Sequence, residues 1–89
     1  MPDSQLKLRL TLTPKVRKQL AALPQKYRKQ YIKAFQLLLS QGPAYRSLRT
    51  HRYRHRGGEI WGSSASMFLR FHWKYAAERT IQVMALSSH

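Results

Sequence analysis

The 89 residues have room for only one small core, so we expect them to form a single domain. Seventeen Lys and Arg residues stand against three acidic residues, so the formal net charge is +14 and most cations must face water, counterions or a polyanion such as nucleic acid. The absence of cysteine excludes disulfides and thiolate metal sites, and no apolar run is long enough to cross a bilayer. We therefore expect one domain over residues 1–89, cytoplasmic and without membrane association.

The first half of the chain predicts one strand and two helices. Leucines alternate with polar residues over Leu6–Leu12, which is the period of a half-buried strand. Thr13 and Pro14 predict a helix start, because a threonine N-cap and a proline at the first helical position are both favoured there. Pro24 interrupts this helix and opens a longer one, which we expect to end near Gln41, before a Gly-Pro pair. The predicted core face of the longer helix comprises Tyr27, Tyr31, Phe35, Leu38 and Leu39.

A basic segment, Tyr45–Arg56, follows the helices and reads YRSLRTHRYRHR. It contains no acid, and cations crowded in this way repel one another unless an anion neutralises them. We therefore predict that the segment binds the phosphates of RNA. The arginines expected to bind this substrate are Arg49, Arg52, Arg54 and Arg56. Tyr53 in the segment and Phe68 beyond it are expected to stack on unpaired bases, as aromatic residues beside cations do in single-strand binders.

The second half predicts three short strands, with connections short enough for an antiparallel meander. A turn at Gly57-Gly58 precedes them, and their expected ranges are Glu59–Ser63, Met67–Lys74 and Arg79–Leu86. Alternation predicts a core face on the last two strands, made of Met67, Leu69, Phe71, Trp73, Tyr75, Ile81, Val83 and Ala85. The other face of the middle strand carries Phe68, Arg70, His72 and Lys74. We expect the helices to cover the first face and to leave the second open.

The element order β-α-α-β-β-β predicts an α+β fold, in which a two-helix hairpin covers one face of a small, antiparallel-rich sheet. This order and several motifs resemble the RelE/ParE superfamily of toxins from bacterial toxin–antitoxin pairs. The segments that carry the resemblance are the opening strand, Lys18–Leu38, Ser47–His55, Glu59–Trp73 and Thr80–His89. Ile60-Trp61, Arg70 and His89 occupy the places of the family's Ile/Leu-Trp strand, its aromatic-flanked Arg and its terminal His or Tyr. Many members carry an acidic or polar residue after the tryptophan, where this chain has Gly62-Ser63.

The resemblance implies a small ribosome-dependent endoribonuclease of the RelE-like RNase type. Such a toxin cuts messenger RNA in the decoding site, and a cognate acidic antitoxin holds it inactive. Two alternatives stay open. One is a gyrase-inhibiting relative of the ParE kind, which shares the fold without the nuclease chemistry. The other is a catalytically degenerate, basic RNA-binding module.

The side-chain inventory suits metal-independent RNA cleavage, in which the 2′-hydroxyl of the substrate is the nucleophile. Three scattered carboxylates cannot build a two-metal clamp, so we expect no metal and no cofactor. Arg70 is the expected transition-state cation, because its guanidinium is permanently charged and can hold two phosphate oxygens. The acid–base candidates are His51 and His55, together with His89 at the place the resemblance implies. His72 and Lys74, on the face of Arg70, are expected to bind substrate.

Overall fold

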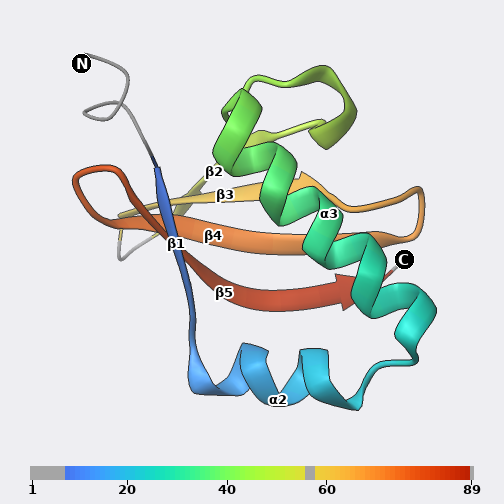
Figure 1. Ribbon diagram of the computed structural model, residues 1–89. Helices are drawn as coiled ribbons and strands as arrows, with labels where there is room; N and C mark the ends of the chain where they lie inside the picture. Colours follow the sequence, from blue (N-terminus) through green and yellow to red (C-terminus); the bar gives the residue numbers. More distant parts are fainter. Residues whose placement is uncertain (1–7, 56–57, 89) are drawn as a thin grey trace, which may run out of the picture.

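The computed structural model describes residues 8–55 and 58–88 of the chain (Figure 1). Leu6 and Lys7 of the expected first strand lie outside the described residues, as do Arg56, Gly57 and His89. The described elements, in chain order, are β1 Arg9–Leu12, α2 Pro14–Ala22, α3 Gln25–Gln41, the 3-10 helix η1 Arg46–Leu48, β2 His51–His55, β3 Gly58–Ser64, β4 Leu69–Ala77 and β5 Thr80–Ser88. Neither helix of the described part is long and apolar enough to span a membrane.

The five strands form one mixed sheet in the order β1-β5-β4-β3-β2. β1 pairs with β5 in parallel, with Leu10 opposite Ile81, and the remaining pairs are antiparallel. The parallel pair joins the first and last strands, so the helices and the remaining strands are the connection that such a pair requires. This arrangement places β2, which lies within the basic segment, at the edge of the sheet opposite β1.

The helix boundaries follow the predicted signals. Thr13 is the N-cap of α2, and its Oγ1 accepts a hydrogen bond from the Val16 amide at 3.2 Å. α3 ends at Gly42, whose φ of 86° suits glycine and whose amide donates to the Leu38 carbonyl at 3.0 Å. Arg28 of α3 donates to carbonyls of Leu20 and Leu23 at the end of α2, which holds the two helices together. The predicted two-helix hairpin is confirmed.

The helices cover one face of the sheet, and the core lies between them and that face (Figure 1). The buried residues of the core are Val16, Tyr31, Ala34, Phe35, Leu38, Leu48, Leu69, Phe71, Trp73, Ile81 and Val83. Phe35 and Phe71 pack edge to face, with ring centroids 5.0 Å apart. Three expected core residues are exposed, one of them Tyr75 near the end of β4, with 47% of its surface accessible. Tyr27 lies in the first turn of α3 with 39% of its surface accessible, and Met67 lies before β4 with 83% accessible.

β2 is a strand that the sequence patterns did not predict separately, and it raises the number of strands from four to five. His51–His55 contains no aliphatic residue, so it lacks the apolar alternation by which strands are recognised. Charged residues are common in edge strands, because they discourage pairing with another chain. β4 begins at Leu69 rather than Met67, which leaves Met67 and Phe68 in the loop before it.

A β-bulge shifts the alternation of β5. Trp73 faces Val83 and His72 faces Ala85, so Met84 is the additional residue on β5. The bulge moves Ala85 to the face of His72 and leaves Leu86 to pack against the core. The prediction that Ala85 continues the core was therefore wrong, because strict alternation does not anticipate an inserted residue.

Candidate nucleic-acid interface

The face of the sheet that the helices do not cover carries several of the predicted site residues. Cross-strand partners share a face, and the register places His51 opposite Gly62 and Gly62 opposite His72. Arg70 and His72 alternate with the fully buried Phe71, so they point away from the core. The members of this open face among the predicted site residues are His51, Tyr53, Arg70, His72 and Lys74. The expectation of an open face on β4 is confirmed.

A hollow of about 490 Å³ lies at one end of the sheet, where η1, α3 and the loop between β3 and β4 meet. Three cations line it, namely Lys33, Arg49 and Arg70. Hydroxyl groups of Ser47, Ser64 and Ser66 add hydrogen-bonding capacity, and Ala34, Leu37, Leu48, Ala65 and Met67 add apolar surface. None of the described residues that line the hollow carries a carboxylate. The hollow therefore combines what a nucleotide needs, namely cations for phosphate and apolar surface for a base.

Hydrogen bonds fix the backbone of Arg70, whereas the Nε atom of its side chain has no partner among the described residues. It stands opposite Ser64 on β3 and Ser87 on β5. The Tyr31 hydroxyl donates to the carbonyls of Arg70 at 3.1 Å and Ser87 at 2.9 Å, which ties α3 to both strands. Burial raises the pKa of Tyr31, so its hydroxyl stays protonated and able to donate. The Arg70 Nε is buried and makes no hydrogen bond to another described residue, so this donor can bind a further acceptor.

Arg49 occupies an unusual backbone conformation beside the same hollow. It ends η1 in the left-handed region, with φ 46° and ψ 50°, where residues other than glycine are disfavoured. The next residue is fixed, because Thr50 Oγ1 lies 2.8 Å from Ser63 Oγ. Ser63 is itself buried and accepts a hydrogen bond from Trp73 Nε1 at 3.0 Å. A polar network in the core thus anchors the segment that presents Arg49.

The structure divides the basic segment between the two faces of the sheet. Arg52 alternates with Tyr53 and stands opposite Trp61, on the face that also bears the core. Its guanidinium lies 5.9 Å from the Trp61 ring centroid and 3.2 Å from Glu59 Oε2. Arg54 shares this face by alternation. Arg52 and Arg54 are therefore not brought together with Arg70, whereas Arg49 lines the hollow with it.

The other predicted residues are placed as follows. β2 carries His55 to the position opposite Gly58, at the end of the sheet away from Arg70, and its side chain lies outside the described part. Arg56 and His89 also lie outside it, although Ser88, which precedes His89, is paired with Leu69. Phe68 lies in the loop beside the hollow with 66% of its surface exposed.

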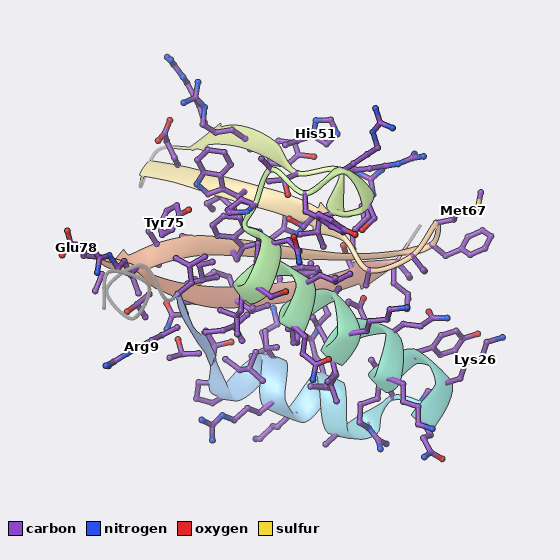
Figure 2. The ribbon with its side chains drawn as sticks, turned by 45° about the horizontal axis from the view of Figure 1, so that its top comes forward. Arg9, Lys26, His51, Met67, Tyr75 and Glu78 are labelled. Carbon is purple, nitrogen blue, oxygen red and sulfur yellow. The ribbon has the colours of Figure 1, made fainter. Side chains whose placement is uncertain are left out.

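The acids of the described part lie at the other end of the molecule. Glu59 is near the start of β3, and Glu78 lies in the turn between β4 and β5. Figure 2 shows Glu78 and Arg9 at the end opposite Met67 and Lys26. No three His, Asp or Glu side chains of residues 8–55 and 58–88 lie close enough to hold a metal ion.

The sequence patterns missed several residues of the hollow. Lys33 is an exposed residue of α3 that no sequence pattern connected with the site, and the serines at 47, 64 and 66 gave no signal of their own. The one usable signal is that Lys33 and Leu37 are four residues apart and so share a side of the helix. Only the tertiary structure shows that this side borders Arg70.

Comparison with solved structures identifies the fold. RelE in the archaeal RelE–RelB complex from Pyrococcus horikoshii OT3 matches with a TM-score of 0.76 and 13% identity, over 92% of this chain and 94% of that one. The chain has the RelE/YoeB fold. YoeB from Staphylococcus aureus matches as a dimer with a TM-score of 0.70 and 12% identity, and in the YoeB–YefM complex with 0.73 and 10%, each over 93% of this chain and 98% of that one.

The RelE/YoeB fold is the fold class that the element order predicted, and the RelE-like resemblance is confirmed at this level. Searches against protein-family models and curated protein sequences found no match. At 10–13% identity, the likeness establishes the arrangement of helices and strands and not the chemistry. The function must therefore be argued from the side chains of this chain.

Proposed function

We propose that this protein is the toxin of a toxin–antitoxin pair and cleaves messenger RNA on the ribosome without a metal ion. The observation that carries the proposal is the unpartnered, buried Nε of Arg70, beside a hollow that holds Arg49 and Lys33 and no carboxylate among its described lining. A buried guanidinium donor is costly unless water or a ligand supplies the acceptor. A phosphate group is the acceptor whose geometry a guanidinium matches.

The proposed reaction is an attack by the 2′-oxygen of one nucleotide on the adjacent phosphorus. A base removes the proton from the 2′-hydroxyl, the new P–O bond forms, and the bond to the 5′-oxygen breaks as an acid protonates that oxygen. Arg70 stabilises the additional negative charge that develops on the phosphate oxygens. The products are a 2′,3′-cyclic phosphate and a free 5′-hydroxyl.

Histidine is the residue type suited to both proton transfers, because it titrates near neutral pH. Among the acid–base candidates, His51 lies on the open face with Arg70, and His89 follows Ser88, which is paired next to Arg70. His55 is the weaker candidate, because its position in β2 lies at the opposite end of the sheet. Arg49 and Lys74 bind phosphates in this proposal, and Phe68 stacks on a base beside the hollow.

The proposed partners are the ribosome, its messenger RNA and an acidic antitoxin. A formal charge of +14 favours ribosomal RNA as a docking surface, and the same charge favours an acidic inhibitor. The matched RelE and YoeB structures include complexes with RelB and YefM, which supports a dedicated protein partner for this chain. In this proposal the chain acts as one domain in the cytoplasm, where translation occurs.

The test compares wild type, Arg70→Ala and Arg52→Ala, each expressed from a tightly controlled promoter in bacterial cells. Primer extension maps 5′ ends on an abundant message within minutes of induction. We expect new cuts that require translation in the wild type and in Arg52→Ala, and at least about a 100-fold loss of cutting in Arg70→Ala. Arg52 is the matched control, because it is a cation of the same basic segment on the other face of the sheet.

Growth arrest with intact messages would contradict the nuclease proposal and indicate the gyrase-inhibiting alternative. Equal cutting by wild type and Arg70→Ala would show that Arg70 takes no part in cleavage. RNA binding without arrest or cuts would leave the degenerate RNA-binding module.

A further inference from the structure

Gly62 lies at the centre of the open face and makes room for two rings. A Cβ atom at this position would lie 2.8 Å from Tyr53 Cε2, and 3.4 Å and 3.5 Å from the His72 atoms Cδ2 and Nε2. The first distance is too short for any real contact, so a side chain here would displace the tyrosine ring. Gly62 does not have a positive φ, so only the space above it requires a glycine.

Tyr53 and His72 meet over this glycine from two different strands. Their ring centroids are 6.0 Å apart, with the planes inclined at 57°. Tyr53 is on the edge strand β2 with 42% of its surface exposed, and His72 is on β4, two strands away and partly buried. The two rings therefore form an aromatic platform above β3, and the tyrosine is exposed enough to meet a ligand.

The platform lies close to the proposed phosphate site. His72 and Arg70 are two residues apart on one face of β4, about 6.6 Å along the strand. His51 and Lys74 flank the platform on the same face with polar and cationic groups, and Ile60 and Ala85, the partners of Tyr53 and His72, add apolar surface. A ring beside a row of cations suits a base attached to a sugar–phosphate chain better than an apolar protein side chain.

We propose that Tyr53 and His72 form the stacking site for one unpaired base of the RNA, and that Gly62 is required because only a glycine leaves room for the tyrosine ring. This proposal rests on the proposed function, because it names a base-binding subsite beside the phosphate that Arg70 holds. It goes beyond the stacking that the sequence predicts for Tyr53, because it joins that ring with His72 in one subsite and assigns a role to Gly62. A paired base would present no free face to the platform.

The test is a binding experiment that involves no cleavage. The full chain is titrated into a short, 2′-O-methylated RNA strand, and into a strand of the same length and charge from which the bases are absent. Stacking contributes about 5- to 150-fold in affinity per base, so the intact strand should bind more tightly by a factor in this range. Tyr53→Leu should lower that preference by at least about fivefold, with Phe68 still able to stack, and change binding to the abasic strand by less than about twofold. Tyr53→Phe, which keeps the ring, should bind like the wild type.

Gly62→Ala provides the second arm of the test. If the glycine serves to seat Tyr53, Gly62→Ala should weaken binding to the intact strand alone, and it should have no further effect when added to Tyr53→Leu. A Gly62→Ala chain that does not fold is recognised from its loss of cooperative thermal unfolding, and the Tyr53 comparison then decides alone.

Equal loss for the intact and abasic strands in Tyr53→Leu would overturn the proposal, because it would show a contribution to phosphate binding or to the fold instead. So would additive losses in Gly62→Ala with Tyr53→Leu. These failures are separate from a failure of the nuclease proposal. Base-dependent binding with uncut messages would support the stacking site and contradict the nuclease proposal. Arg70-dependent cuts without a base preference in binding would support the nuclease proposal and contradict the stacking site.

Discussion

The two ends of the sheet contain the same residue type in the same unusual backbone conformation, but in opposite electrostatic surroundings. We call them the hollow end, with Arg49, Arg70 and the loop before β4, and the turn end, with Glu78 and Arg79 between β4 and β5. Arg49 and Arg79 both have positive φ, at 46° and 58°. The turn end also contains the acids of the described part, including Glu59, which pairs with Arg52.

The difference shows where the charge of this chain is neutralised and where it is not. At the turn end a carboxylate lies 3.2 Å from a guanidinium, whereas the hollow end collects cations with no described acid in its lining. An anion approaching the hollow end therefore meets no competing carboxylate among the described lining residues. Positive φ at Arg79 is explained by a tight turn between two strands, while the same conformation at Arg49 presents a cation to the hollow.

The largest expected effect on stability is that of Ser63→Ala. The change removes the acceptor of the buried Trp73 Nε1 and the partner of Thr50 at the hollow end. An unsatisfied buried donor costs about 1–3 kcal/mol, so the free energy of unfolding should fall by that amount in urea titrations. Thr80→Ala is the matched control at the turn end, where the hydroxyl makes an exposed hydrogen bond of 3.4 Å, and it should change stability by less than about 0.5 kcal/mol.

A carboxylate placed at the hollow end should weaken RNA binding more than one placed at the turn end. Ser47→Glu adds an acid to the lining of the hollow, and Ala76→Glu adds the same charge to an exposed position before the β4–β5 turn. We expect about a tenfold loss of RNA affinity for the first and less than about twofold for the second, measured at one salt concentration. Equal losses would show that net charge, and not its location, governs binding.

Tyr31→Phe should have a smaller effect. It removes the hydroxyl that donates to the carbonyls of Arg70 and Ser87, and should cost about 1 kcal/mol in the free energy of unfolding. Tyr75→Phe, at an exposed tyrosine of the turn end, is the control and should be nearly neutral.

The pH dependence of Tyr31→Phe follows from the raised pKa of Tyr31, which burial causes. The stability that the protonated hydroxyl contributes is complete below the ordinary tyrosine pKa of about 10, and is lost as the pH rises toward the folded value. The difference between wild type and Tyr31→Phe should therefore narrow above about pH 10. A difference that widens would contradict burial as the cause of the shift.

Local signals in the sequence predicted the helices and the core strands well. The Thr13 cap and the Gly42 stop each act within one turn of helix, and alternation in β4 reported the buried Phe71 and Trp73 directly. β2 was not predicted as a strand, because polar residues occupy both of its faces. The bulge places Leu86 rather than Ala85 against the core, and no local pattern in the sequence predicts it.

The candidate site was predicted only in part. Arg70 and His72 followed from alternation in β4, but the separation of Arg49 from Arg52 and Arg54 depends on which face of an edge strand meets the core. Lys33 and the role of Gly62 depend on contacts between segments far apart in the sequence. Such contacts are set by the tertiary structure, and neither composition nor periodicity reports them.

The central claim is that the hollow end is the RNA site. The most direct test replaces, one at a time, the two arginines with a left-handed backbone conformation by glycine. Glycine relieves the positive φ, so Arg49→Gly and Arg79→Gly should each raise the free energy of unfolding by about 0.5–1 kcal/mol. Only Arg49→Gly should also lose RNA affinity, by about tenfold, because only Arg49 lines the hollow. Two stabilised variants that bind RNA equally well would contradict the claim.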